Sequence, residues 1–150
     1  MKYELLTEDT EAVGSVTLYR IRALVDFGNV VAGDLGGYIQ SEANLSQEGN
    51  AWVADSARVY GSARVTDDAR VYGSAQVFGN AEVSGKAWVS DSARVAGSAW
   101  VHDRAWVHDN SRVFDNAWVT GNAWVTGRSL VYGNARVSAD TVVSGYTIVL

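Results

Sequence analysis

The chain has 150 residues, no Cys, no Pro and a formal net charge of −5. The absence of Cys excludes disulfide and thiolate chemistry and is typical of a cytoplasmic protein, and no long apolar run indicates a signal peptide or a membrane span. The modest negative charge argues against general nucleic-acid binding.

The N-terminal part predicts a small β cap. Residues 2–6 (KYELL) and 16–24 (VTLYRIRAL) have the composition of strands, and the polar residues 7–15 link them. We expect a β-hairpin that covers one end of the molecule, because a bare end would expose a row of unpaired backbone groups. The cap is expected over residues 1–28 and the remaining structure over 29–150, within one structural domain.

A loose six-residue spacing begins after Val31. The segment 43–45 (ANL) fits the spacing, whereas residues 33–37 (GDLGG) and 47–50 (QEGN) look like enlarged corners. We therefore expect the first coil to contain extra residues.

From Val53 to Val149, a Val stands at every sixth position. A small residue, usually Ala, lies two positions before each Val, and Gly or Asp lies two positions after it, with Ala139 as the exception. A period of six does not keep one stripe on a helix of 3.6 residues per turn, but it suits a short strand followed by a corner. Ala and Val share one face of that strand. Stacked units would bury both in one column without a pocket, so function belongs on the outer surface.

This stretch resembles the hexapeptide-repeat proteins, in which a small residue follows an aliphatic residue four positions later. Residues 59–64 (VYGSAR) and their copies carry the resemblance over residues 51–150. It implies an all-β fold: a single-stranded left-handed parallel β-helix with three hexads, or 18 residues, per coil. The handedness comes from the resemblance and not from the period.

A second resemblance concerns the front of the chain. Residues 18–24 (LYRIRAL), 26–28 (DFG), 33–39 (GDLGGYI) and 44–46 (NLS) look like small hexapeptide-repeat proteins of bacteriophages and prophages. This resemblance implies an origin and an architecture, and it implies no particular activity.

Residues 18 apart should lie above one another on the outer surface. The slot before each Val gives three rows: Trp52, Arg70, Trp88, Trp106, Trp124, Val142; Arg58, Gln76, Arg94, Arg112, Leu130, Ile148; and Arg64, Glu82, Trp100, Trp118, Arg136. The slot after Val gives the row Tyr60, Phe78, Ala96, Phe114, Tyr132, Leu150.

Two interpretations of these rows remain open. Flat rings on neighbouring coils can stack, and Arg70 can make cation–π contacts with Trp52 and Trp88. A broad aromatic stripe can also form an interface. The candidate interface residues are Trp88, Trp100, Trp106, Trp118, Trp124, Leu130, Tyr132, Ile148 and Leu150. Apolar residues also crowd the last coils, so we expect a homo-oligomer formed through that end or through an aromatic face.

Acyl transfer is the main enzymatic alternative, since many hexapeptide-repeat proteins are acyltransferases with a His base in a cleft between subunits. The two His residues, His102 and His108, occupy ordinary outward slots one hexad apart, and no loop interrupts the hexads. A base without a cleft has nothing to hold a substrate beside it. The sequence therefore favours a protein that is not an enzyme.

No metal or other cofactor is expected. His102-Asp103 and His108-Asp109 resemble ligand pairs, but Asp fills the same corner slot elsewhere without a His, and the two His lie on different faces. Exposed Trp residues also suit sugar stacking, which keeps carbohydrate binding as a minor alternative.

The sequence favours a non-catalytic structural or protein-interaction protein of phage or prophage type, located in the cytoplasm. It would bind itself, or another protein such as a host factor, through outward aromatic and Arg rows. A divergent acyltransferase is the alternative.

Overall fold

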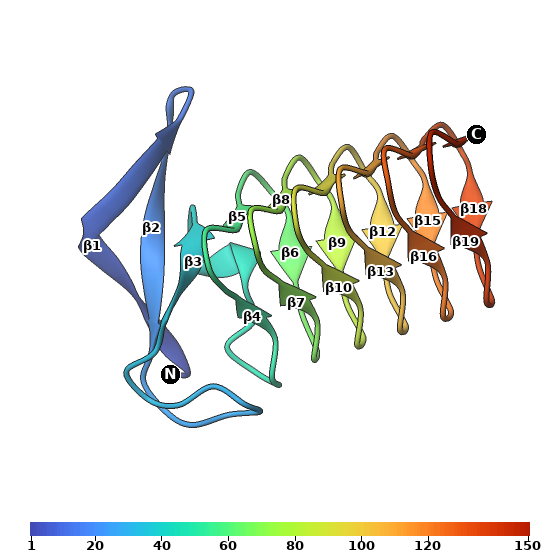
Figure 1. Ribbon diagram of the computed structural model, residues 1–150. Helices are drawn as coiled ribbons and strands as arrows, with labels where there is room; N and C mark the ends of the chain where they lie inside the picture. The colour runs from blue at the N-terminus through green and yellow to red at the C-terminus, as the bar shows by residue number, and fades with distance from the viewer.

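The computed structural model describes residues 1–150 as a β-solenoid with a hairpin at one end (Figure 1). The coils stack from the N-terminal hairpin to the last coil at the opposite end. The all-β fold predicted from the six-residue period is confirmed, and so are the stacked parallel coils that the family resemblance implied.

Each hexad folds as predicted into a short strand and a corner. The two strand residues are the outward residue and the Val, so the coils contain the strands β4 (Trp52–Val53), β5 (Arg58–Val59), β6 (Arg64–Val65), β7 (Arg70–Val71), β8 (Gln76–Val77), β9 (Glu82–Val83), β10 (Trp88–Val89), β11 (Arg94–Val95), β12 (Trp100–Val101), β13 (Trp106–Val107), β14 (Arg112–Val113), β15 (Trp118–Val119), β16 (Trp124–Val125), β17 (Leu130–Val131), β18 (Arg136–Val137), β19 (Val142–Val143) and β20 (Ile148–Val149).

Three parallel sheets form the sides of the solenoid. Strand β10 pairs with β7 and β13, so that Trp88 lies beside Arg70 and Trp106. The same register repeats along the sheets β19-β16-β13-β10-β7-β4 and β18-β15-β12-β9-β6, and along the part of the third sheet that runs from β5 to β20. Pairing between residues 18 apart confirms the three predicted outer rows.

The interior is the predicted column of small and branched residues. Val53, Val89 and Val125 are fully buried, as are Ala51 and Ala87 two residues before the first two of them. Together with their copies they belong to one continuous apolar core. A residue as short as Ala leaves room for the opposing Val, which explains the alternation of the two sizes.

The corners depend on a left-handed backbone conformation. The Gly or Asp two residues after Val has φ near +60°, for example 57° at Asp55 and 67° at Gly61. Gly accepts this conformation without steric cost, and Asp does so better than most residues. This explains why the slot contains Gly or Asp in every hexad except the one at Ala139.

The N-terminal segment forms a longer hairpin than the sequence predicted. Strands β1 (Tyr3–Val13) and β2 (Val16–Ala23) pair in antiparallel fashion, with a register shift between Leu6 and Thr10. The polar residues 7–13, predicted to be a link, therefore belong to a strand. Polar side chains are tolerated there because this part of the hairpin projects beyond the solenoid, as Figure 1 shows.

The first coil joins the hairpin to the stack. Strand β3 (Leu35–Ile39) pairs with β2 on one side and with β5 on the other, so the hairpin extends one sheet of the solenoid. The prediction of a corner over residues 33–37 was wrong, because Gly36 and Gly37 are buried strand residues.

Of the unit predicted at residues 43–45, only Leu45 lies as expected, because a 3₁₀ turn leaves Ala43 exposed and buries Asn44. The 3₁₀ turn η1 (Glu42–Asn44) precedes Leu45, which is fully buried and bridges to Val65. The buried Asn44 side chain donates to the carbonyl oxygen of Ala63 at 2.8 Å and thereby ties this turn to the next coil.

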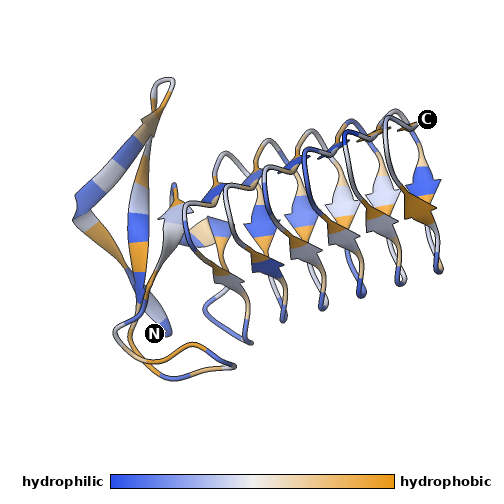
Figure 2. Cartoon of the chain, viewed as in Figure 1, coloured by the Kyte–Doolittle hydropathy of each residue, from blue (hydrophilic) through white to orange (hydrophobic).

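Figure 2 shows that hydrophilic residues recur at the turns of successive coils, whereas strand β19 is hydrophobic along its length. The structure contains no helix with the length and apolarity needed to cross a bilayer. The outer surface therefore contains both polar corners and apolar strand positions, and it carries the candidate sites.

Candidate functional site

The Trp residues of the largest row meet edge to face. The ring centroids of Trp88 and Trp106 lie 5.8 Å apart at 82°, and those of Trp106 and Trp124 lie 5.4 Å apart at 80°. The flat stacking predicted for these rings is wrong, because the positive edge of one indole prefers the negative face of the next. Trp88 and Trp124 remain 43% and 46% exposed.

The second Trp pair lies on another sheet. Trp100 and Trp118 also meet edge to face at 5.1 Å, and the guanidinium of Arg136 lies 4.0 Å from the Trp118 ring centroid. Arg136 therefore makes the cation–π contact that the sequence predicted for Arg70. Arg70 has no such contact and instead lines a groove.

Flat stacking occurs on the third face. Tyr60 and Phe78 lie 5.2 Å apart with nearly parallel rings, and Phe114 and Tyr132 lie 5.0 Å apart in the same way. These single-ring side chains confirm the stacking interpretation for this row. These four rings therefore contact each other within the chain.

An open groove runs along the row of Trp88, Trp106 and Trp124. Its volume is about 650 Å³, and its other lining residues include Arg70, Lys86 and Arg104. Lys86 and Arg104 occupy corner positions two residues before Trp88 and Trp106, so two neighbouring coils each bring a cation beside an indole. The only carboxylate in the lining belongs to Asp68, and the groove is therefore both aromatic and cationic.

The two His side chains are packed against Trp rings. His102 stacks on Trp100, and His108 lies on Trp106, each with 4.1 Å between ring centroids. The Nε2 atom of each imidazole is enclosed and has no hydrogen-bond partner, while Nδ1 faces a carboxylate. The packing fixes the ring plane and leaves Nδ1 as the atom directed toward other polar groups.

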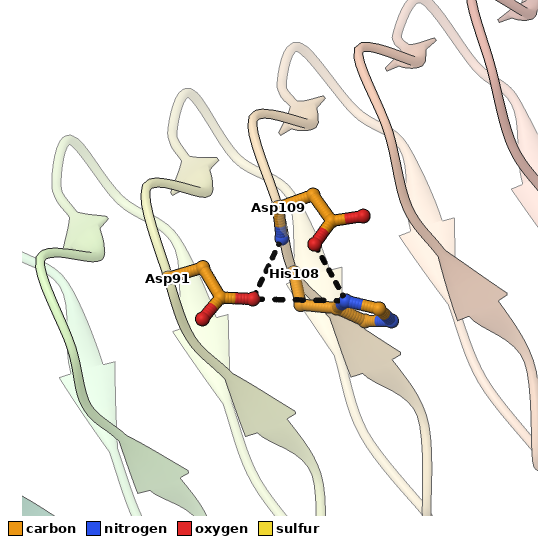
Figure 3. A group of neighbouring side chains, drawn as sticks. All are labelled: Asp91, His108 and Asp109. Carbon is orange, nitrogen blue, oxygen red and sulfur yellow. Dashed lines mark hydrogen bonds and ion pairs between the residues drawn. The ribbon is translucent and has the colours of Figure 1, made fainter.

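Asp91, His108 and Asp109 form a close polar cluster (Figure 3). His108 Nδ1 lies 3.3 Å from Asp109 Oδ1 and 3.7 Å from Asp91 Oδ2. A bond from the Gly127 amide is the first cause of the lowered pKa of Asp109, and His108 contributes as well. The pKa of Asp103 is lowered similarly, first by the Gly121 amide and then by His102.

Two perturbed groups in the hairpin have structural roles. Burial lowers the pKa of Lys2 to about 8, although Asp68 opposes this effect, and its Nζ donates to the Ala51 carbonyl oxygen at 2.8 Å. Burial also raises the pKa of Tyr3, whose hydroxyl donates to the Leu45 carbonyl oxygen at 2.5 Å. Both side chains tie the first strand to the coil beneath it.

Comparisons with known proteins agree with this architecture. A family model described as the YdcK beta solenoid repeat matches residues 57–73, 75–91 and 131–145. These matches cover less than half of the chain, and they agree with its fold as a β-solenoid of six-residue repeats. It is also similar to a protein of Escherichia coli (strain K12) described as "Uncharacterized acetyltransferase YdcK", with 49% identity over 41 residues. That match covers 27% of this chain and 13% of the relative, so it spans only a small part of the length of either protein.

The predicted interface residues of this β-solenoid are distributed over all three faces. Trp88, Trp106 and Trp124 line the groove, whereas Trp100 and Trp118 lie on another sheet. The remaining predicted residues, Leu130, Tyr132, Ile148 and Leu150, belong to the third face. The structure therefore brings together only part of the predicted set.

Sequence reasoning missed the cations of the groove and the third member of the polar cluster. Lys86 and Arg104 are corner residues, and the rows considered from the sequence contained only the positions beside Val. Asp91 was treated as an ordinary corner residue. Its spacing of 18 from Asp109 was the available signal, since residues 18 apart meet on neighbouring coils.

Proposed function

We propose that this solenoid is a non-catalytic protein-interaction module that binds an acidic segment of a partner in the groove of Trp88, Trp106 and Trp124. The observation that carries the proposal is that Lys86 and Arg104 line the same groove as Trp88 and Trp124, which are nearly half exposed. Aromatic and Arg side chains are enriched at protein interfaces and contribute most to their binding energy. A prophage origin and a host factor as the partner remain predictions from the front-segment resemblance.

An acidic partner is favoured over a neutral one by charge complementarity. Arg70, Lys86 and Arg104 outnumber the single lining carboxylate of Asp68, although the whole chain is acidic. The net charge of the groove lining is therefore positive, whereas that of the rest of the molecule is negative. Such a contrast directs an acidic segment to the groove and disfavours other docking positions.

Panning a random peptide library on the immobilised full chain tests the proposal. We expect enriched peptides to contain acidic residues beside apolar ones. Their binding should weaken about tenfold or more in Trp124→Thr and in the double variant Lys86→Glu, Arg104→Glu. Arg94→Glu, on another face, is the matched control and should bind as the wild type does.

Two outcomes would contradict the proposal. One is enrichment of peptides without an excess of acidic residues. The other is binding that survives both groove variants. Retained thermal unfolding curves would show that the variants are folded, because all the substituted side chains point outward.

Acetyl transfer is the second candidate function, and it is favoured by the likeness to the Escherichia coli protein described as an acetyltransferase. The enclosed Nε2 atoms of His102 and His108 argue against it, because a general base must reach the proton that it removes. Isothermal titration with acetyl-CoA and an assay of CoA release would decide. If the protein releases CoA and this turnover disappears in His102→Asn or His108→Asn, acetyl transfer would replace protein interaction as the proposed function.

A further inference from the structure

The polar cluster of Asp91, His108 and Asp109 combines one imidazole with two carboxylates from adjacent coils. Asp91 follows strand β10, and His108 and Asp109 follow the neighbouring strand β13. Figure 3 shows the two carboxylates on the same side as His108 Nδ1. Imidazole nitrogen and carboxylate oxygen are common ligands of Zn²⁺ and related ions.

The spacing of the donor atoms fits a metal shell. One donor atom from each residue can be chosen so that all lie within 4.8 Å of one another. His108 Nδ1 lies 3.3 Å from Asp109 Oδ1 and 3.7 Å from Asp91 Oδ2. Donors about 2.0–2.2 Å from a tetrahedral ion are separated by about 3.3–3.6 Å, so the two distances from His108 Nδ1 need only small shifts.

The surrounding structure orients the donors. Asp109 Oδ2 accepts a bond from the Gly127 amide at 3.0 Å, which leaves Oδ1 directed at His108. Asp91 Oδ2 accepts from the Asp109 amide at 3.1 Å, and Trp106 fixes the plane of the His108 ring. Contacts that orient the metal-binding side chains in this way affect the affinity of a site for its metal.

We propose that Asp91, His108 and Asp109 bind a divalent transition-metal ion such as Zn²⁺. His108 supplies Nδ1, and each Asp supplies one carboxylate oxygen. The Asp side chains are 56% and 48% exposed, so water can complete the coordination. This site lies outside the groove lining and does not depend on the proposed interaction function.

The chain contains a matched comparison for this site. Trp100, His102 and Asp103 repeat the arrangement one hexad earlier, with the same 4.1 Å stacking and with His102 Nδ1 3.2 Å from Asp103 Oδ1. The position that corresponds to Asp91 is Gly85. The earlier cluster therefore has one carboxylate in place of two and should bind the ion far more weakly.

Calorimetric titration of Zn²⁺ into the chelator-treated full chain tests the proposal. We expect one equivalent to bind, and a loss of affinity of at least about tenfold in His108→Asn and in Asp91→Asn. Asn at position 91 tolerates the positive φ and keeps an oxygen for the Asp109 amide, so this variant removes mainly the charge. His102→Asn should bind as the wild type does.

A variant that should gain a metal site provides a second test of the proposal. Gly85→Asp places a second carboxylate above Asp103. Its Cβ would lie 2.9 Å from the Asp103 amide nitrogen, and Asp91 above Asp109 shows that neighbouring coils can shift enough to hold such a pair. We expect a second equivalent of Zn²⁺, and Co²⁺ should give the visible absorption of a low-symmetry site in both proteins. Absence of saturable binding at millimolar Zn²⁺, or equal binding by His108→Asn, would show that the cluster is only an ion pair.

Discussion

The left-handed corner residue decides how closely successive coils approach. Asp55, Asp67 and Asp91 adopt φ near +57° and also accept a hydrogen bond from the backbone amide of the residue 18 positions later, at 3.0–3.1 Å. Asp thus tolerates the conformation and satisfies a donor on the next coil. Gly has only the first of these properties, which gives a physical reason for the use of Asp at these corners.

Ala139 is the one corner residue that is neither Gly nor Asp, with φ 53°. A left-handed Ala costs about 1–2 kcal/mol, and part of the gain from Gly is lost through its greater freedom in the unfolded chain. Ala139→Gly should therefore raise the free energy of unfolding by about 0.5–1 kcal/mol, measured by urea denaturation.

The control for Ala139→Gly is the reverse change in the preceding hexad. Gly133 has φ 64°, and a Cβ added there would come no closer than 3.8 Å to another atom outside its neighbours. Gly133→Ala should lower the free energy of unfolding by a similar amount. Equal stability of all three proteins would mean that the corner conformation carries no measurable strain.

Strand β3 is the element that connects the hairpin to the solenoid. A Cβ on Gly36 would lie 2.5 Å from the Val53 carbonyl oxygen and 2.6 Å from Ile21 Cγ1. A Cβ on Gly37 would lie 2.6 Å from the Ala57 carbonyl oxygen. The two glycines let β3 lie directly against the coil that contains β4 and β5, and a larger residue would separate the two parts.

Gly36→Ala should lower the free energy of unfolding by about 1–3 kcal/mol, because backbone atoms must move to admit the methyl group. Chemical denaturation measures the change. Gly14→Asn in the hairpin turn is the control, since nothing lies within 4 Å of a Cβ there and Asn tolerates its φ of 58°. A loss no larger than that of the control would show that the junction adapts freely.

The buried core of the whole molecule is a linear column, because each coil contacts only the coils beside it. Such stacks keep their interior uniform and place all chemical variety outside. The three faces consequently differ: one has the aromatic and cationic groove, one has the Trp100 and Trp118 pair, and one has stacked single rings. Because the three faces are separate, a solenoid that binds partners can make different contacts through each face.

Self-association is a prediction about the whole molecule. Val142, Tyr146, Ile148 and Leu150 of the last coil are each between 59% and 78% exposed. We expect the 150-residue chain to form oligomers through these apolar side chains, since burying them removes apolar surface from water. Light scattering over a concentration series should give a rising mass for the wild type and a constant monomer mass for Ile148→Ser.

The control for that measurement is Trp106→Ala, which alters the groove and leaves the last coil unchanged. Oligomers that dissociate only in Trp106→Ala would assign self-association to the groove face. A monomer at every concentration in the wild type would refute the prediction.

The sequence alone determined the coil, the buried column and the outer rows. A period of six defines which residues point inward, and this follows from local geometry that repeats without interruption. The three hexads per coil that the family resemblance implies then place Trp88, Trp106 and Trp124 in one row. A strictly periodic chain leaves few alternatives for the pairing of its strands, so prediction was accurate there.

The tertiary structure decided how the side chains meet. The edge-to-face Trp contacts, the enclosed His Nε2 atoms and the approach of Asp91 to His108 depend on rotamers and coil spacing, which a period does not specify. Backbone pairing with β2 likewise decided that the polar residues 7–13 form a strand. Local composition gave no sign of this, because the pairing energy comes from a partner elsewhere in the chain.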